Sequence, residues 1–383
     1  MDGVSAILLF VAGVVSVPLV WNGARPVIDP TRRYSPRWLW AMVVIEMAPF
    51  WLALHLVVIT VGVSSGALGL LLGRVGVVLL VVCVGMLVWI LVRTRIGVRR
   101  LRPRVSGPVH PARGPARWRG RPVPTPPGVR EVHGIPWRDG LTLDLARPDD
   151  ERSSLPVLVY VHGGGWTNGD PQRQARDLYH TLALGGWATL GIRYPFTPQV
   201  MVEDQIATVR AAVRWARDEL RAHGVDATSV VLAGGSAGGH LAAMATLTAA
   251  GEEQVAACVG IYGIYDMANR NRTRAHWAKI RNEVMLSTVD EQPERYRAVS
   301  PIDRVHDRTP PFLIVHGTHD TLVPVGEGEQ FVGVLRAAGR PVEYVPVYGA
   351  QHAFDAVSGI TSRTTAAAIR DWLHATVLAP VDR

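Results

Sequence analysis

The stretch that decides the fold is SVVLAGGSAGGHLAAMATLTAA, residues 229–250. Its first seven residues are mostly apolar and predict a buried strand, whereas the rest, rich in alanine and leucine, predicts a helix. Ser236 stands between them in the run Gly234-Gly235-Ser236-Ala237-Gly238. A serine on a sharp strand-to-helix turn, flanked by glycines, is typical of a nucleophile elbow, because the turn strains the backbone and brings strand and helix close together. An ordinary glycine-rich turn is the competing interpretation.

Strands and helices alternate on both sides of this stretch, from residue 129 to residue 383. The pattern begins with a predicted hairpin over 129–148 and continues with buried strands separated by amphipathic helices. Continuous apolar strands that alternate with helices predict a mostly parallel, doubly wound sheet. One insertion, at about 264–300, is long enough for a small cap.

A second glycine run, His162-Gly163-Gly164-Gly165-Trp166, follows the predicted strand PVLVYV. Consecutive glycines leave their main-chain N–H groups free of side chains, so that these groups can stabilise an oxyanion together with the N–H of Ala237. A phosphate-binding loop would need a G-K-[ST] or GxGxxG pattern at the start of a helix, and neither is present.

An acid and a histidine follow Ser236 in the order that such a serine requires. Asp320 comes after the predicted strand PFLIVHG, and His352 comes after VEYVPV. Both predicted loops lie at the carboxyl edge of the sheet, where functional groups gather. We expect His352 to exchange a proton with Ser236 and Asp320 to orient the imidazole. A metal cluster of His316, His319 and Asp320 is disfavoured because no HExxH-like spacing supports it, so no metal or cofactor is expected.

With these motifs in this order, residues 128–378 resemble the α/β-hydrolase esterases of the hormone-sensitive lipase type, in particular their actinobacterial, mycobacterial membrane-associated branch. The strings that carry the resemblance are HGGGW, GGSAGGHLAA, YGIYD, SPI, PPFLIVHGTHDTLVPV and GAQHAFD. The resemblance implies an α/β-hydrolase fold and hydrolysis of carboxylic esters. It further implies a catalytic triad of Ser236, Asp320 and His352, with Gly163, Gly164 and Ala237 as oxyanion donors. The chain departs from the family pattern in its reduced cap and in Arg193-Tyr194-Pro195, where relatives have a Tyr-Arg pair.

The net charge of +8 is unevenly distributed. Residues 93–130 contain eleven arginines and no acid, whereas residues 131–383 carry 24 basic and 29 acidic side chains. The excess of positive charge therefore belongs to one short segment, and nucleic acid is not an expected partner. The two cysteines, Cys83 and Cys258, exclude a disulfide scaffold.

The first 92 residues predict about three transmembrane helices, over 4–20, 38–63 and 67–92. A cleaved signal peptide is the alternative for the first run, although Asp2 and the lack of an A-x-A site disfavour it. The arginine- and proline-rich residues 93–128 predict an extended linker that attracts anionic lipid headgroups. Arginines are dense between the first two runs and after the third, which predicts a multi-pass protein of the cell membrane with a cytoplasmic catalytic domain.

The sequence therefore predicts a membrane-anchored serine carboxylesterase or lipase whose ester substrate is a lipid or another molecule that partitions into the membrane. Two alternatives on the same fold stay open: a prenylcysteine-methylesterase-like and a formamidase-like hydrolase. A catalytically silent membrane scaffold is a third alternative, which the presence of serine, acid and histidine disfavours.

Overall fold

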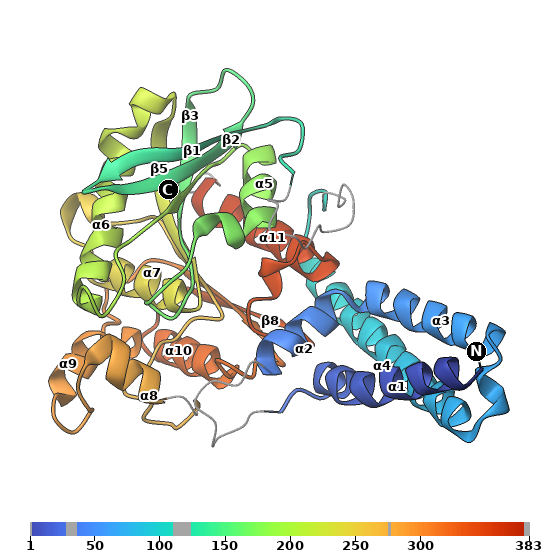
Figure 1. The fold of residues 1–383 in the computed structure, drawn as a ribbon. Coiled ribbons are helices and arrows are strands. Elements are labelled where there is room, and N and C mark those ends of the chain that lie inside the picture. Colours follow the sequence, from blue (N-terminus) through green and yellow to red (C-terminus); the bar gives the residue numbers. More distant parts are fainter. Residues whose placement is uncertain (1, 28–36, 110–123, 275–276, 379–383) are drawn as a thin grey trace.

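The computed structural model describes residues 2–27, 37–109, 124–274 and 277–378. A stem of apolar helices projects from a larger domain in which helices pack on a central sheet (Figure 1). The stem corresponds to the N-terminal apolar residues, and the sheet domain begins at Val129.

Among its described residues the stem contains four α-helices: α1 (Asp2–Ala24), α2 (Arg37–Glu46), α3 (Ala48–Ser64) and α4 (Leu71–Leu101). Helices α1 and α4 are long and apolar enough to cross a membrane, and the bent pair of α2 and α3 would be a third span if it counts as one. Residues 38–63, expected as one helix, are divided in two: α2 and α3 meet at 82°. Pro49 lies in the first turn of α3 and has no N–H to continue a preceding helix, which explains the break at Met47.

Helix α4 also ends later than the sequence predicts. It continues past Val92 to Leu101 and is followed by a short 3₁₀ turn, Arg102–Arg104. The first part of the expected extended linker is therefore helical, because its arginines lie at positions where their long side chains reach solvent or carbonyl groups and do not interrupt the backbone ladder. Residues 110–123 of that linker lie outside the described residues.

The sheet has eight strands in the order β1-β2-β4-β3-β5-β6-β7-β8. The first two strands form the expected antiparallel hairpin, β2 pairs antiparallel with β4, and every other neighbouring pair is parallel. The strands are β1 (Val129–Arg138), β2 (Leu141–Pro148), β3 (Ser154–Val161), β4 (Ala188–Ile192), β5 (Asp226–Gly235), β6 (Cys258–Ile261), β7 (Phe312–Gly317) and β8 (Val342–Val347).

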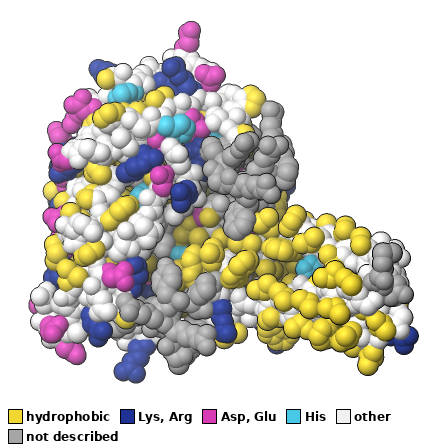
Figure 2. Space-filling model, viewed as in Figure 1, with side chains coloured by type: hydrophobic (Ala, Val, Ile, Leu, Met, Phe, Trp, Pro, Cys, Tyr) yellow, Lys and Arg dark blue, Asp and Glu magenta, His cyan; other side chains and the backbone are white. Residues whose placement is uncertain are grey.

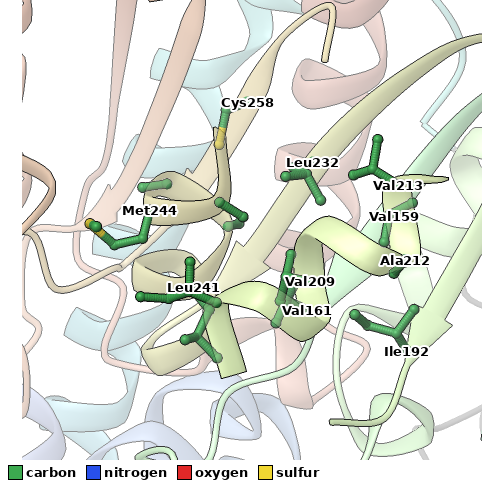
Figure 3. Close-up of a cluster of buried hydrophobic side chains, with 14 of the residues drawn as sticks. Val159, Val161, Ile192, Val209, Ala212, Val213, Leu232, Leu241, Met244 and Cys258 are labelled. Atoms are coloured by element: carbon green, nitrogen blue, oxygen red, sulfur yellow. The ribbon is translucent and has the colours of Figure 1, made fainter. Parts of the chain in front are cut away.

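Helices cover both faces of the sheet, so each face has its own hydrophobic core. One core joins the sheet to α6 (Val202–Asp218), α7 (Ala237–Leu247) and α10 (Gly326–Ala337). Figure 3 shows side chains of α6 and α7 packed against those of β3, β4 and β5 in this core. The other core joins the sheet to α5 (Arg176–Leu184) and α11 (Ile360–Leu373). Strands buried on both faces explain the continuous apolar runs in the sequence.

The insertion at 264–300 forms only short helical pieces among its described residues. They are α8 (Trp277–Lys279), a π-helical turn (Ile280–Met285) and α9 (Pro293–Ala298). Because α4 packs against β8 and α11, the stem joins the sheet domain at the edge strand β8 (Figure 1).

Candidate active site

Ser236 lies on the tight turn between β5 and α7 with φ of 57° and ψ of −122°. Non-glycine residues rarely adopt a positive φ, so the turn holds the serine in a strained conformation. The flanking glycine is required by space: a Cβ added to Gly238 would lie 2.0 Å from the carbonyl oxygen of Val161. The Ser236 N–H donates to the carbonyl of Ile261 at 2.9 Å, which fixes the turn against β6.

The structure brings the three side chains expected from the sequence together. His352 Nε2 lies 3.0 Å from Ser236 Oγ, and His352 Nδ1 lies 2.7 Å from Asp320 Oδ2. Ser236 is half-buried, whereas Asp320 and His352 are each only 3 % exposed. These contacts form one hydrogen-bonded chain that ends at the hydroxyl of Ser236.

Asp320 is held as a carboxylate by the groups around it. Its Oδ1 accepts the N–H groups of Leu322 at 2.9 Å and Val323 at 2.8 Å, and its Oδ2 faces His352. Burial alone would raise the pKa of Asp320, but His352 and His316 outweigh burial and hold this pKa below its usual range. An ionised Asp320 fixes the tautomer of His352 that carries its proton on Nδ1 and leaves Nε2 to accept from Ser236.

The glycine loop corrects one expectation about the oxyanion donors. The N–H of Gly163 is already bonded to Gln174 Oε1 at 2.7 Å, so it is not free to meet an oxyanion. The N–H groups of Gly164, Gly165 and Ala237 have no acceptor among the described residues. Gly164 has φ of 139°, and a Cβ there would lie 1.7 Å from the carbonyl oxygen of Asn168, so only glycine fits.

Buried aromatic and histidine side chains pack against the glycine loop, residues 162–166. The ring of His162 stacks on Tyr194 at 4.4 Å, and the Tyr194 hydroxyl donates to the His162 carbonyl at 2.9 Å. Trp166 Nε1 donates to His240 Nδ1 at 3.1 Å. Burial lowers the pKa of both His162 and His240 to about 4, so both are neutral at pH 7 and serve the scaffold. The order Arg193-Tyr194, where relatives have Tyr-Arg, therefore places the tyrosine ring against His162 at the start of the glycine loop.

Three further residues at the site were not predicted as functional. Gln174 occupies the Gly163 N–H, Tyr262 packs its ring 4.7 Å from that of His352, and Trp38 of α2 packs perpendicular to the same ring at 5.6 Å. Tyr262 belongs to the YGIYD string, which therefore carried a signal. Trp38 reaches the site from the N-terminal stem, whereas Gln174 lies 11 residues after Gly163, and no local pattern marks either residue.

A model of the BD-FAE family matches residues 143–335, just over half of the chain. The chain belongs to the BD-FAE family. This BD-FAE chain has the α/β-hydrolase fold with a mostly parallel eight-stranded sheet, as the resemblance implied.

The BD-FAE chain is similar to proteins that are named as esterases and methylesterases. "Esterase LipC" of Mycobacterium tuberculosis is 38 % identical over 60 % of this chain, and "Isoprenylcysteine alpha-carbonyl methylesterase ICME" of Arabidopsis thaliana is 27 % identical over 55 %. The chain spans 60 % of LipC and 53 % of ICME. Among solved structures, an esterase of Thermogutta terrifontis, Est2, is 27 % identical with a TM-score of 0.53 and covers 67 % of this chain and 96 % of its own. The same esterase has been solved "phosphonylated by sarin".

Proposed function

We propose that this protein is a serine carboxylesterase of the lipase class that forms an acyl-enzyme. The observation that carries the proposal is the hydrogen-bonded chain from Asp320 through His352 to Ser236, at 2.7 and 3.0 Å. Similarity to LipC and to Est2, both named as esterases, supports carboxylic esters as the substrate class. Both relatives are matched over part of this chain only, so the substrate itself has to be established by assay.

The geometry supports each step of such a mechanism. His352 Nε2 takes the proton of Ser236 as the Oγ attacks the ester carbonyl, and Asp320 stabilises the imidazolium that results. The negative oxygen of the tetrahedral intermediate accepts hydrogen bonds from the N–H groups of Gly164 and Ala237, and the N–H of Gly165 lies next to them in the chain. When the intermediate collapses, His352 gives its proton to the departing alcohol. Water activated by the same imidazole then attacks the acyl-enzyme and releases the acid.

We also propose that the stem anchors the protein in the cell membrane. Helices α1 and α4 have the length and composition of membrane spans, and the bent pair adds a third crossing if it acts as one. The arginines after Val92, in the last turns of α4 and beyond it, favour a cytoplasmic catalytic domain and contact with anionic headgroups. Protease accessibility of the sheet domain in intact and in opened cells tests the orientation, because a domain cleaved in intact cells would be outside.

Labelling with a fluorophosphonate tests the enzyme proposal directly. The wild-type protein should be labelled at Ser236, and Ser236→Ala should abolish the labelling. Ser229→Ala is a matched control on the same strand and should be labelled like the wild type. Labelling that persists in Ser236→Ala would exclude this serine as the nucleophile, and a folded wild type that is not labelled would favour a silent scaffold.

A substrate panel separates the proposal from its alternatives on the same fold. Similarity to the plant methylesterase ICME is the observation that favours the first alternative. Hydrolysis of p-nitrophenyl esters in preference to prenylcysteine methyl esters and formylkynurenine would support a carboxylesterase. A preference for either of the other two substrates by more than about tenfold in kcat/KM would replace it.

A further inference from the structure

Helix α2 belongs to the stem but packs on the sheet domain. Met42 and Val43 are buried in a cluster with Val357, a residue that follows β8. Glu46, the last residue of α2, packs closely on Gly359: a Cβ added to this glycine would lie 2.8 Å from Glu46 Oε2. The 82° bend at Met47 turns α2 away from the direction of α3 and along this edge (Figure 1). Thus α2 forms a bridge between the apolar stem and the loop that carries His352.

At the first turn of α2, Trp38 reaches the candidate active site itself. Its ring is half-buried and meets the ring of His352 edge-on, with centroids 5.6 Å apart and planes at 88°. Tyr262 lies against the same imidazole at 4.7 Å. The imidazole that faces Ser236 is therefore in contact with one aromatic ring from the sheet domain and one from the stem.

The contact is held in place by a second attachment of the stem near the same loop. Arg93 of α4 donates to the carbonyls of Gly23 at 2.9 Å and Ala24 at 2.7 Å, at the carboxyl end of α1. Its side chain also packs on Gly349, where a Cβ would lie 3.0 Å from Arg93 Cγ. Because Gly349 precedes His352 by three residues, the stem is fixed relative to the imidazole.

The apolar surface of the stem continues toward this point. Leu39, next to Trp38 on α2, is 41 % exposed, and many large apolar side chains of α1, α3 and α4 are also exposed. Figure 2 shows hydrophobic side chains gathered over the stem and up to its junction with the sheet domain. A surface of this composition suits hydrocarbon, and its continuity gives an acyl chain an apolar route.

We propose that α2 forms the acyl-binding wall of the active site, with Trp38 as the residue that contacts the chain of an ester drawn from the bilayer. The proposal rests on the proposed esterase function and adds a substrate class, esters with long aliphatic acyl chains. Chain carbons that leave lipid along α2 stay in contact with apolar groups until the carbonyl reaches Ser236. Short acyl groups offer few carbons to this wall and gain little from it.

Kinetics of the full-length protein in phospholipid nanodiscs test this proposal. We expect Trp38→Ala to lower the ratio of kcat/KM for p-nitrophenyl decanoate to that for the acetate by about tenfold, mainly through KM. That figure corresponds to lost contact with slightly fewer than two methylenes, each worth about fourfold. Trp40→Ala should change the ratio by less than twofold, because Trp40 is 43 % exposed and lies two residues beyond Trp38, about 200° around the helix and on the opposite face. Trp38→Phe keeps an aromatic ring and should retain most of the preference.

The outcomes separate this proposal from the one on which it rests. An unchanged ratio in Trp38→Ala, or an equal fall in Trp40→Ala, would overturn the acyl-wall proposal. A parallel loss of kcat with both esters would assign Trp38 to the support of His352 only and would also overturn it. Fluorophosphonate labelling of Ser236 is measured in every variant. Normal labelling in any of these cases leaves the esterase proposal standing, whereas a wild type without labelling overturns both.

Discussion

Replacing Asp320 by asparagine should disable the site by changing the tautomer of His352 without changing its position. Oδ1 of Asp320 accepts two backbone N–H groups, from Leu322 and Val323, so in Asp320→Asn the amide oxygen must stay there. The amide NH₂ then takes the place of Oδ2, 2.7 Å from His352 Nδ1. An NH₂ group can only donate, so Nδ1 must accept and the ring proton moves to Nε2. There it faces Ser236 Oγ and cannot take its proton.

The magnitude follows from the loss of the general base. A wrong histidine tautomer in a serine–histidine–aspartate site lowers kcat by about 10⁴, so we expect a fall of about 10³–10⁴ here. KM should change little, because Asp320 is buried behind His352. The change also removes a buried charge along with a charge-assisted hydrogen bond, two effects of opposite sign, so Tm should shift by only a few degrees.

The assay is kcat for p-nitrophenyl butyrate, with Tm measured on the same samples. Asp144→Asn is a matched control, because Asp144 is equally buried, at 3 % exposure, but pairs with Arg193. The control should retain kcat within about threefold, whatever its effect on Tm. A kcat of Asp320→Asn within tenfold of the wild type, or a comparable fall in the control, would refute the tautomer argument.

Two further predictions concern the scaffold. Gly238→Ala places a methyl group 2.0 Å from the Val161 carbonyl oxygen and should lower Tm by more than 5 °C or prevent folding. Gly333→Ala is the matched variant in α10, where the added methyl group meets open space, and it should raise the free energy of unfolding by about 1 kcal/mol. Equal effects of the two in a thermal-shift assay would contradict the packing argument. Acid should destabilise the protein between pH 6.5 and 4, because the unfolded chain protonates His162 and His240 near 6.5 and the folded chain only near 4. Together the two histidines should lower the free energy of unfolding by about 2.7 kcal/mol for each pH unit in that window. A free energy of unfolding that stays level from pH 7 to 4.5 in denaturant titrations would refute this prediction.

The sequence predicts the sheet domain well because its signals are local. A strand, a glycine turn and a small-residue helix around Ser236 each depend on neighbouring residues. Asp320 and His352 could be placed because parallel strands end at a common edge, so loops far apart in the chain meet there. The proximity of the three side chains follows from this rule without any knowledge of packing, whereas the order of the strands does not.

What the sequence does not predict depends on side-chain contacts that no local pattern marks. Two adjacent glycines have the same local pattern, and only the side chain of Gln174 distinguishes the occupied N–H of Gly163 from the free one of Gly164. Trp38 looks like an aromatic residue at a membrane interface, because composition does not reveal which surface a short helix will cover. The break after Glu46 has a local cause, Pro49, but the direction taken by α2 does not.

Contacts of α4 and of the residues after it attach the stem to the sheet domain. Leu101 of α4 is 2 % exposed and belongs to the core between the sheet, α5 and α11, so removing the stem would expose a surface worth about 2 kcal/mol at this residue alone. Arg104 pairs with Glu343 of β8 at 3.2 Å, and the N–H of Ser106 donates to Asp371 of α11 at 2.6 Å. A helix bundle that served only as a tether would need none of these contacts. Their position beside β8 and the His352 loop is what a protein requires if its active site is to be held at a fixed height above a membrane.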